Sequence, residues 1–112
     1  MKKFIVLYHG SMDGWDPSKS SPEDMAKGME AWMTWAKNCG DKLVDMGTPL
    51  GNGVALSPDG KSTNSGKNVM GYSVLQAENL DAAKKLMEGH PHLAWNASCS
   101  IEVHECMPMP GR

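Results

Sequence analysis

The sequence predicts a single α+β domain whose strands and helices follow the order β-α-β-β-α-β. Two observations predict this order. Short apolar runs of strand length alternate with two segments of helical periodicity, and both helical segments are bounded by typical capping residues. The chain has 112 residues, the length of one domain, and contains no repeat or linker-like segment. We therefore expect one domain over residues 1–112.

Two elements are expected in the first forty residues. Residues 4–8 form an apolar run typical of a strand. Ser21 and Pro22 are typical of the N-cap and first position of a helix, and Gly40 is typical of its end. The helix should bury one apolar stripe, with Trp35 at the edge of the stripe, where its indole can line a pocket. The stripe comprises Met25, Met29, Trp32, Met33 and Ala36.

The remaining elements follow from the same signals. Asn79 and Gly89 are typical of the N-cap and the end of a second helix over residues 80–88. The remaining strands are expected at residues 42–45, 68–76 and 100–105, with a short one at 54–56 inside a turn region rich in Gly, Ser and Asn. This order is the split βαβ, or ferredoxin-like, arrangement: an antiparallel sheet with two helices on one face.

The strand patterns also predict a partner. The run at residues 4–8 is apolar on both faces, and the strand at 68–76 resembles it. Two short helices cover only one face of such a sheet. Soluble monomers rarely leave an apolar face of this size bare, so we expect a second copy of the chain to cover the other face in a homodimer.

Composition excludes several other classes of partner. The net charge is −2 and no basic stripe occurs, so nucleic acid is not expected. The longest apolar run has five residues (4–8), too few for a membrane span or for the apolar core of a signal peptide, and we expect a cytoplasmic protein. The three cysteines lack C-x-x-C spacing, which argues against a disulfide framework or a zinc knuckle. No phosphate-loop signature occurs, and we expect no cofactor.

The most distinctive motif is the histidine-rich segment at residues 89–95. Pro91 ends a helix and favours an extended backbone at His90, which is a purely structural interpretation of the motif. In an extended backbone, however, His90 and His92 would point the same way and present two imidazoles to one cleft. Imidazoles serve as acids or bases near neutral pH, so both are candidate site residues. Metal binding by His90, His92 and His104 is a further alternative.

The last expected strand carries a second candidate site. Glu102 and His104 alternate with apolar Ile101 and Val103, so both polar side chains should lie on the face away from the helices. A carboxylate beside an imidazole fixes its tautomer and raises its pKa. The alternative is an edge strand whose polar face is simply in water. Asp45 is another candidate carboxylate partner, or else it only accepts backbone hydrogen bonds in the turn that follows it.

Five segments together carry a resemblance to a known family: residues 31–35, 43–50, 71–74, 82–83 and 101–103. In order and spacing they resemble the YCII-related (YciI-like) proteins of the dimeric α+β barrel superfamily, whose domains are ferredoxin-like. The resemblance covers nearly the whole chain. It implies a barrel-like dimer with a pocket in each protomer. In the wider superfamily, relatives handle small aromatic or lactone molecules by proton transfer or dehalogenation.

The chain departs from that family at the residues its chemistry would use. Better-known members carry a histidine early in the first helix, whereas residues 29–32 contain none. They also tend to have Asp-Pro-aromatic after the second helix, where this chain has His90-Pro91-His92. The His/Asp pair that the resemblance implies is therefore absent in its usual form, and no activity transfers directly.

Taken together, these features predict a homodimer that binds a small organic molecule and acts as a cofactor-independent acid/base enzyme of the isomerase or lyase type. His104 or His92 would be the acid/base residue, and Glu102 or Asp45 would orient it. The alternative is a non-catalytic ligand-binding or accessory protein that lacks the family's His/Asp pair. The expected ligand-binding residues are His9, Trp32, Trp35, Tyr72, His90 and Trp95.

Overall fold

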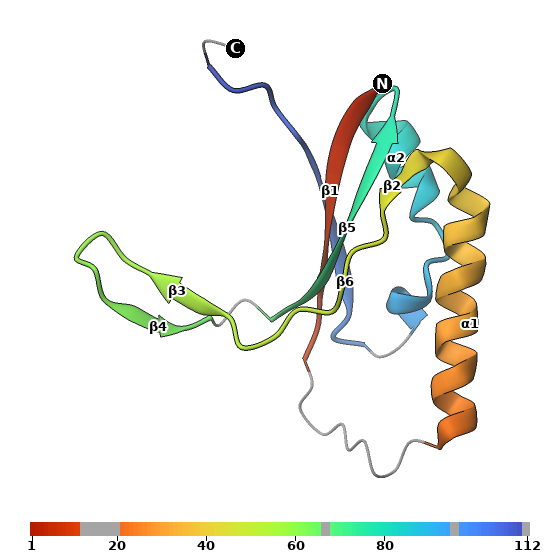
Figure 1. The fold of residues 1–112 in the computed structure, drawn as a ribbon, viewed down its shortest axis with the longest axis horizontal. Helices are drawn as coiled ribbons and strands as arrows, with labels where there is room; N and C mark the ends of the chain where they lie inside the picture. Colours follow the sequence, from red (N-terminus) through yellow and green to blue (C-terminus); the bar gives the residue numbers. More distant parts are fainter. Residues whose placement is uncertain (12–20, 66–67, 95–96, 111–112) are drawn as a thin grey trace.

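The computed structural model describes residues 1–11, 21–65, 68–94 and 97–110. Within these residues it contains a four-stranded antiparallel sheet, two α-helices and a separate two-stranded hairpin (Figure 1). The order across the sheet is β2-β5-β1-β6. The bounds are β1 Lys2–His9, β2 Leu43–Asp45, β5 Val69–Ala77 and β6 Ser100–Glu105. The α+β class and the antiparallel sheet that the sequence predicts are confirmed.

Helix α1, Pro22–Cys39, begins and ends where the capping residues predict. The Ser21 side chain accepts a hydrogen bond from the Asp24 N–H at 3.1 Å, which satisfies one of the free N–H groups of the first turn. Gly40 follows the helix with φ of 57°, a conformation that glycine adopts at little cost. A short 3₁₀ turn, Gly40–Lys42, then leads into β2.

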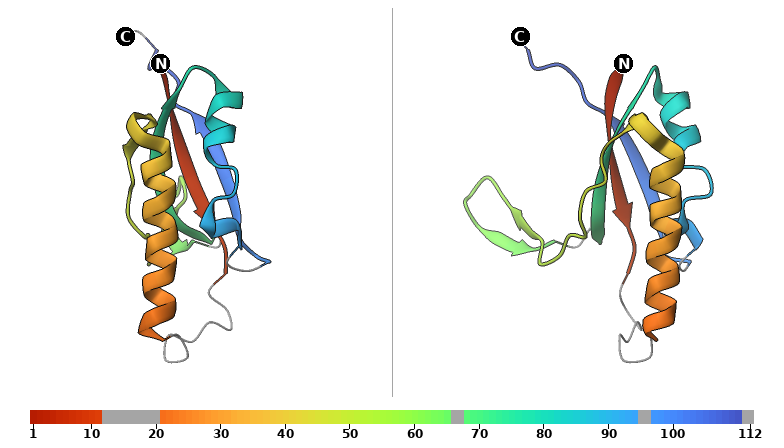
Figure 2. Two further views of the ribbon diagram at one scale, coloured as in Figure 1. Left: turned by 90° about the vertical axis from the view of Figure 1, so that its right-hand side faces the viewer. Right: turned by 45° about the vertical axis from the view of Figure 1, so that its right-hand side comes forward.

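Helix α2, Leu80–Leu86, is short and depends on its cap and its packing. The Asn79 side chain accepts a hydrogen bond from the Ala82 N–H at 2.8 Å. The Trp35 indole N–H donates to the Leu86 carbonyl at 2.8 Å, so the end of α2 is tied to α1. Both helices cover the same face of the sheet (Figure 2).

The hydrophobic core lies between that face and the C-terminal half of α1. It comprises Phe4, Val6, Tyr8, Trp35, Cys39, Leu75, Ala77, Ala83 and Met87. The expected apolar stripe of α1 is therefore wrong in part, because Met25, Met29 and Met33 are each more than half exposed. Trp35 and Cys39 are buried instead, since the N-terminal half of α1 extends away from the core.

The face of the sheet away from the helices, which we call the open face, is apolar at its centre. Ile5, Leu7 and Val74 are half-buried there, although neither α1 nor α2 covers them. In the register between β1 and β6, Ile5 lies opposite His104 and Leu7 lies opposite Glu102. Glu102 and His104 therefore lie on the open face, as the alternation along the last strand predicts.

A hairpin of β3, Val54–Leu56, and β4, Ser62–Asn64, projects from the body of the molecule (Figure 1). The short strand at 54–56 was predicted from the sequence, but its partner β4 was not. Every residue of both strands is exposed, including Val54 and Leu56. In the part of the chain that the structure covers, no helix is long and apolar enough to cross a membrane.

Candidate functional site

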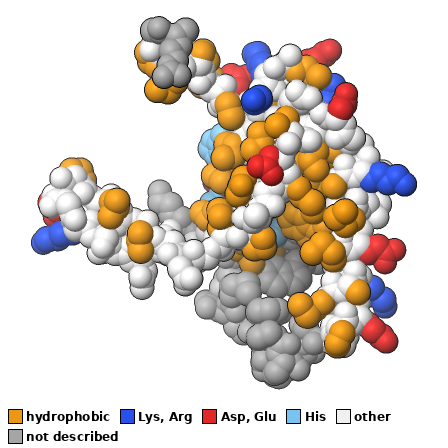
Figure 3. All heavy atoms as spheres, viewed as in Figure 1, with side chains coloured by type: hydrophobic (Ala, Val, Ile, Leu, Met, Phe, Trp, Pro, Cys, Tyr) orange, Lys and Arg blue, Asp and Glu red, His pale blue; other side chains and the backbone are white. Residues whose placement is uncertain are grey.

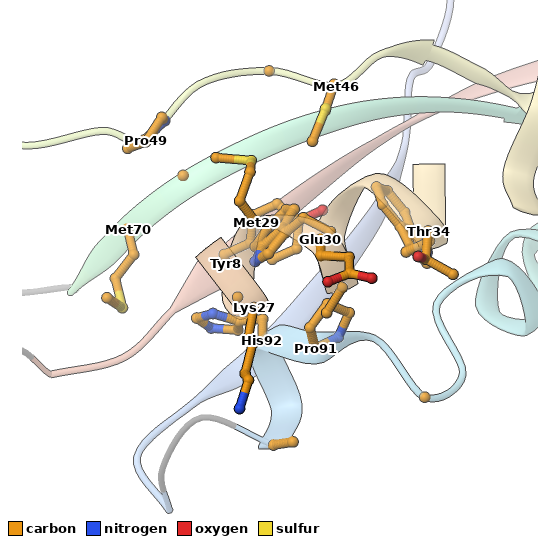
Figure 4. Close-up of a pocket in the computed structure, with 18 of the residues that line it drawn as sticks. Tyr8, Lys27, Met29, Glu30, Thr34, Met46, Pro49, Met70, Pro91 and His92 are labelled. Atoms are coloured by element: carbon orange, nitrogen blue, oxygen red, sulfur yellow. The ribbon is translucent and has the colours of Figure 1, made fainter. Parts of the chain in front are cut away.

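A cavity of about 1250 Å³ opens between α1, the segment after β2 and a 3₁₀ turn at Pro91–Ala94 (Figure 4). We call it the helix-side pocket. Its walls are largely apolar and methionine-rich, and hydrophobic side chains gather around the hollow between the sheet and α1 (Figure 3). Residues that line it include Met25, Met29, Trp32, Met46 and Met70.

A buried hydrogen-bonded chain lies at the sheet side of this pocket. The Tyr8 hydroxyl lies 2.8 Å from the Ser73 hydroxyl, and Ser73 donates to the Met46 carbonyl at 2.7 Å. Because a carbonyl only accepts, the single Ser73 proton is used there, and Tyr8 must donate to Ser73. Burial raises the pKa of Tyr8 to about 12, so the phenol remains protonated at neutral pH.

The loop that supplies the Met46 carbonyl is held in a tight turn. Asp45 ends β2, and its carboxylate accepts a hydrogen bond from the Gly47 N–H at 2.8 Å. Gly47 has φ of 77°, and a Cβ at this position would collide with the Tyr72 carbonyl oxygen. Glycine is thus required here by both conformation and space.

His90 is enclosed in an aromatic cage. Its ring centroid lies 4.4 Å from that of Trp32, 4.5 Å from that of Trp35 and 5.0 Å from that of Tyr8. Its Nδ1 accepts a hydrogen bond from the His92 backbone N–H at 3.0 Å, so Nε2 carries the proton. Nε2 is buried without a conventional hydrogen-bond partner among the described residues. Burial, and secondarily the charge of His92, lowers the pKa of His90 to about 4.

His92 lies in the Pro91–Ala94 turn and lines the pocket. Its Nε2 lies 2.8 Å from the His9 carbonyl oxygen, which can only accept, so Nε2 carries the proton. Nδ1 makes no hydrogen bond to any described residue. An extended backbone does not continue from His90 to His92, because Pro91 begins a 3₁₀ turn. Even so, both His90 and His92 contact the Tyr8 ring, so the two imidazoles do share one side of the sheet.

The open face holds a second cluster of titratable groups. His104 Nε2 lies 2.9 Å from Glu102 Oε1, which is the contact that their spacing predicts. His9 Nε2 lies 3.5 Å from the same oxygen. The hydrogen bond from His104, together with the nearby charges of the two histidines, lowers the pKa of Glu102. Both Glu102 and His104 are more than half exposed, whereas the His9 side chain is largely covered.

The predicted site residues therefore separate into two groups. Near the helix-side pocket lie Trp32, Trp35, His90 and His92. Tyr72 also contributes to the pocket lining, but it lies opposite Leu7 in the register, so its side chain belongs to the open face. On the open face lie the side chains of His9, Glu102 and His104. Trp95 lies outside the described residues.

Asp45 is not placed to orient His104. It belongs to β2, at the opposite edge of the sheet from β6, so it is separated from His104 by three strand spacings, or about 14 Å. It makes the turn contact that the sequence left open as its alternative role.

The alternative of a metal site at His90, His92 and His104 is not supported by this arrangement. His104 lies on the open face, and the other two lie on the helix side. Among the described residues, no three His, Cys, Asp or Glu side chains are grouped to hold a metal ion.

Sequence reasoning missed the chain formed by Tyr8, Ser73 and the Met46 carbonyl. The sequence pattern places Tyr8 only in an apolar strand. The available signal was Ser73, a hydroxyl in the middle of a strand that is otherwise apolar, because a buried hydroxyl requires a partner.

Comparison of the sequence with models of known protein families gives no match, and comparison with curated proteins gives no significant match.

Proposed function

We propose that this protein binds a small, largely apolar organic molecule in the helix-side pocket and that His92 is the acid/base residue of an isomerase- or lyase-type reaction there. The observation that carries the proposal is the hydrogen bond from His92 Nε2 to the His9 carbonyl. It fixes the tautomer and the orientation of the ring, and it leaves Nδ1 with a lone pair when the ring is neutral.

The surroundings of His92 suit proton transfer. Nδ1 can take a proton from one atom of a bound molecule and return it to another atom or to a leaving group. The His9 carbonyl oxygen stabilises the positive charge that forms on the ring. Tyr8 remains neutral, so it serves as a hydrogen-bonding group and not as a base. Trp32, which is half-buried, gives the pocket an apolar wall, and a less polar surrounding strengthens these interactions.

The test is a turnover screen of small aromatic acids, lactones and enols, followed by single substitutions. His92→Ala should lower the rate of any turnover by about a hundredfold or more, as expected for the loss of an acid/base residue. His104→Ala is the matched control and should leave the rate within about twofold. An unchanged rate for His92→Ala would rule out this role for His92.

Ligand binding without catalysis is the second candidate function. It is favoured by the absence of any histidine in the first helix, because the YciI-like proteins that the sequence resembles carry one there. Thermal stabilisation by members of the same panel, with no turnover of any of them, would support this function over the enzymatic one.

We also propose a homodimer of the dimeric α+β barrel type, with a ferredoxin-like protomer related to the YciI-like proteins. The strand order supports the protomer type, because β5 lies between β1 and β2 as in a split βαβ unit. The apolar centre of the open face supports the dimer. A second copy on this face would also enclose the contact between Glu102 and His104.

A further inference from the structure

The polar groups around Tyr8 in the helix-side pocket have a fixed hydrogen-bond direction. The Met46 carbonyl takes the Ser73 proton, and Ser73 therefore takes the Tyr8 proton. With its only proton used in this way, the Tyr8 oxygen can offer a bound molecule only a lone pair. Any group that reaches this oxygen must itself be a donor.

His92 can also act only as an acceptor toward a bound molecule, and a separate contact is the reason. Its Nε2 proton is used by the His9 carbonyl, so the neutral ring offers a ligand only the lone pair of Nδ1. The rings of Tyr8 and His92 lie next to each other, with centroids 5.3 Å apart. The sheet side of the pocket therefore presents two neighbouring residues that both accept.

Charged groups of the pocket do not favour an anion over a neutral molecule. Lys27 is accompanied by Asp24 and Glu30, all three of which come from α1 and line the pocket. Glu88 also lines the pocket, so three carboxylates outnumber the one ammonium, and a carboxylate ligand gains no net attraction.

We infer that the pocket selects a neutral, ring-sized apolar molecule that carries a hydroxyl group, because both His92 Nδ1 and the Tyr8 oxygen require a donor. This inference rests on the proposed function and defines its ligand class. The hydroxyl would donate to His92 Nδ1, and the apolar body would lie against the methionines and Trp32. A carboxylate or an ether at the same position would place an oxygen lone pair against the lone pair of His92 Nδ1. Neither the ligand oxygen nor Nδ1 would then have a hydrogen-bond partner.

Three matched probes test the inference: 2-naphthol, 2-methoxynaphthalene and 2-naphthoate, titrated into the full chain by isothermal titration calorimetry at neutral pH. The naphthol should bind roughly fivefold or more tightly than either of the others, which is the usual effect of one neutral hydrogen bond. His92→Phe keeps a ring but no acceptor, and it should bring the affinities for naphthol and its methyl ether within about twofold. His104→Ala, the control variant, should keep the wild-type preference.

The outcomes separate this inference from the function on which it rests. Equal binding of the naphthol and its ether, or tightest binding of the naphthoate, overturns the hydroxyl preference and leaves the apolar pocket as the binding site. No binding of any probe at millimolar concentration overturns the proposed small-molecule site itself. Because the wild-type series alone decides between these results, the test stands even where the His92→Phe chain fails to fold.

Discussion

At the scale of single residues, His90 and His92 differ in the surroundings of their rings. Both are buried, and both contact Tyr8. His90 has its Nδ1 occupied by the His92 backbone N–H and its other nitrogen enclosed by Trp32 and Trp35, whose π-faces are at most weak acceptors. His92 has Nε2 held by a carbonyl, while its Nδ1 makes no hydrogen bond to any described residue. His90 is thus suited to hold the turn, and His92 is suited to act on a ligand.

Acid should destabilise the fold through His90. Its pKa is about 4 in the folded chain against 6.5 ordinarily, so between these values the unfolded chain binds a proton that the folded chain does not. The free energy of unfolding should therefore fall as pH drops from 6.5 towards 4, by at most about 3 kcal/mol from this group. Urea unfolding at pH 7 and at pH 4.5 measures the difference.

His90→Asn is the informative variant for this prediction. The amide oxygen of Asn can accept the same N–H two residues along the chain, as in an Asx turn, but the side chain does not titrate. This variant should lose stability through packing at both pH values and show a smaller difference between them. A pH difference equal to that of the wild type would show that another group causes the acid sensitivity.

Single residues were predictable where the deciding contact is local. The contact between Glu102 and His104, and the alternative turn contact of Asp45, follow from a separation of two positions along the chain. The partners of Tyr8 and His92 could not be predicted in this way. Ser73 and the His9 carbonyl lie 65 and 83 positions away from them, and only the folded sheet brings these groups together.

At the scale of elements, helix starts were predictable, whereas the end of α2 and the buried face of α1 were not. The second helix is expected over residues 80–88 but ends at Leu86. Ser21 and Asn79 cap the two helices through bonds to N–H groups three positions later, which the sequence alone specifies. Which face of α1 is buried depends on where the sheet ends beneath it. Met25 and Met29 fit the apolar period, yet they lie beside the helix-side pocket and not in the core.

Strand β4 and the 3₁₀ turn at Pro91–Ala94 could not be predicted either, because both depend on contacts that local sequence signals do not show. Strand β4 consists of Ser62, Thr63 and Asn64, which carry no apolar pattern, so it is defined only by pairing with β3. The 3₁₀ turn at Pro91–Ala94 is held by the contacts of His90 and His92 with residues distant in the chain. Local signals indicate that the helix stops before Pro91, but they place its end two residues beyond Leu86 and do not indicate the 3₁₀ turn that follows.

At the scale of the whole molecule, the sheet separates two surfaces with different character. The helix side has the pocket, Tyr8 and His92. The open face has Ile5, Leu7 and Val74 at its centre, and neither of the described helices covers them. The projecting hairpin adds exposed Val54 and Leu56, and a two-stranded hairpin alone is marginally stable in water. These features are why we propose that a second copy covers the open face.

Leu7→Lys should convert the proposed dimer into a monomer. Leu7 lies at the centre of the open face, and a lysine there faces Glu102 across the strand pair, so the sheet itself should tolerate the change. Sedimentation equilibrium at micromolar concentration should give a dimer for the wild type and a monomer for this variant. Leu80→Lys, on the exposed start of α2, is the control and should remain a dimer. A wild-type chain that sediments as a monomer contradicts the proposal.

The most direct test of the functional account is an NMR titration that follows the imidazole ¹⁵N resonances of all four histidines while 2-naphthol is added to the wild-type chain. The account predicts that the Nδ1 resonance of His92 moves with saturation, while the resonances of His104 change little. A titration that moves His104 and leaves His92 in place, or that moves neither, would contradict the assignment of the site to the helix side of the sheet.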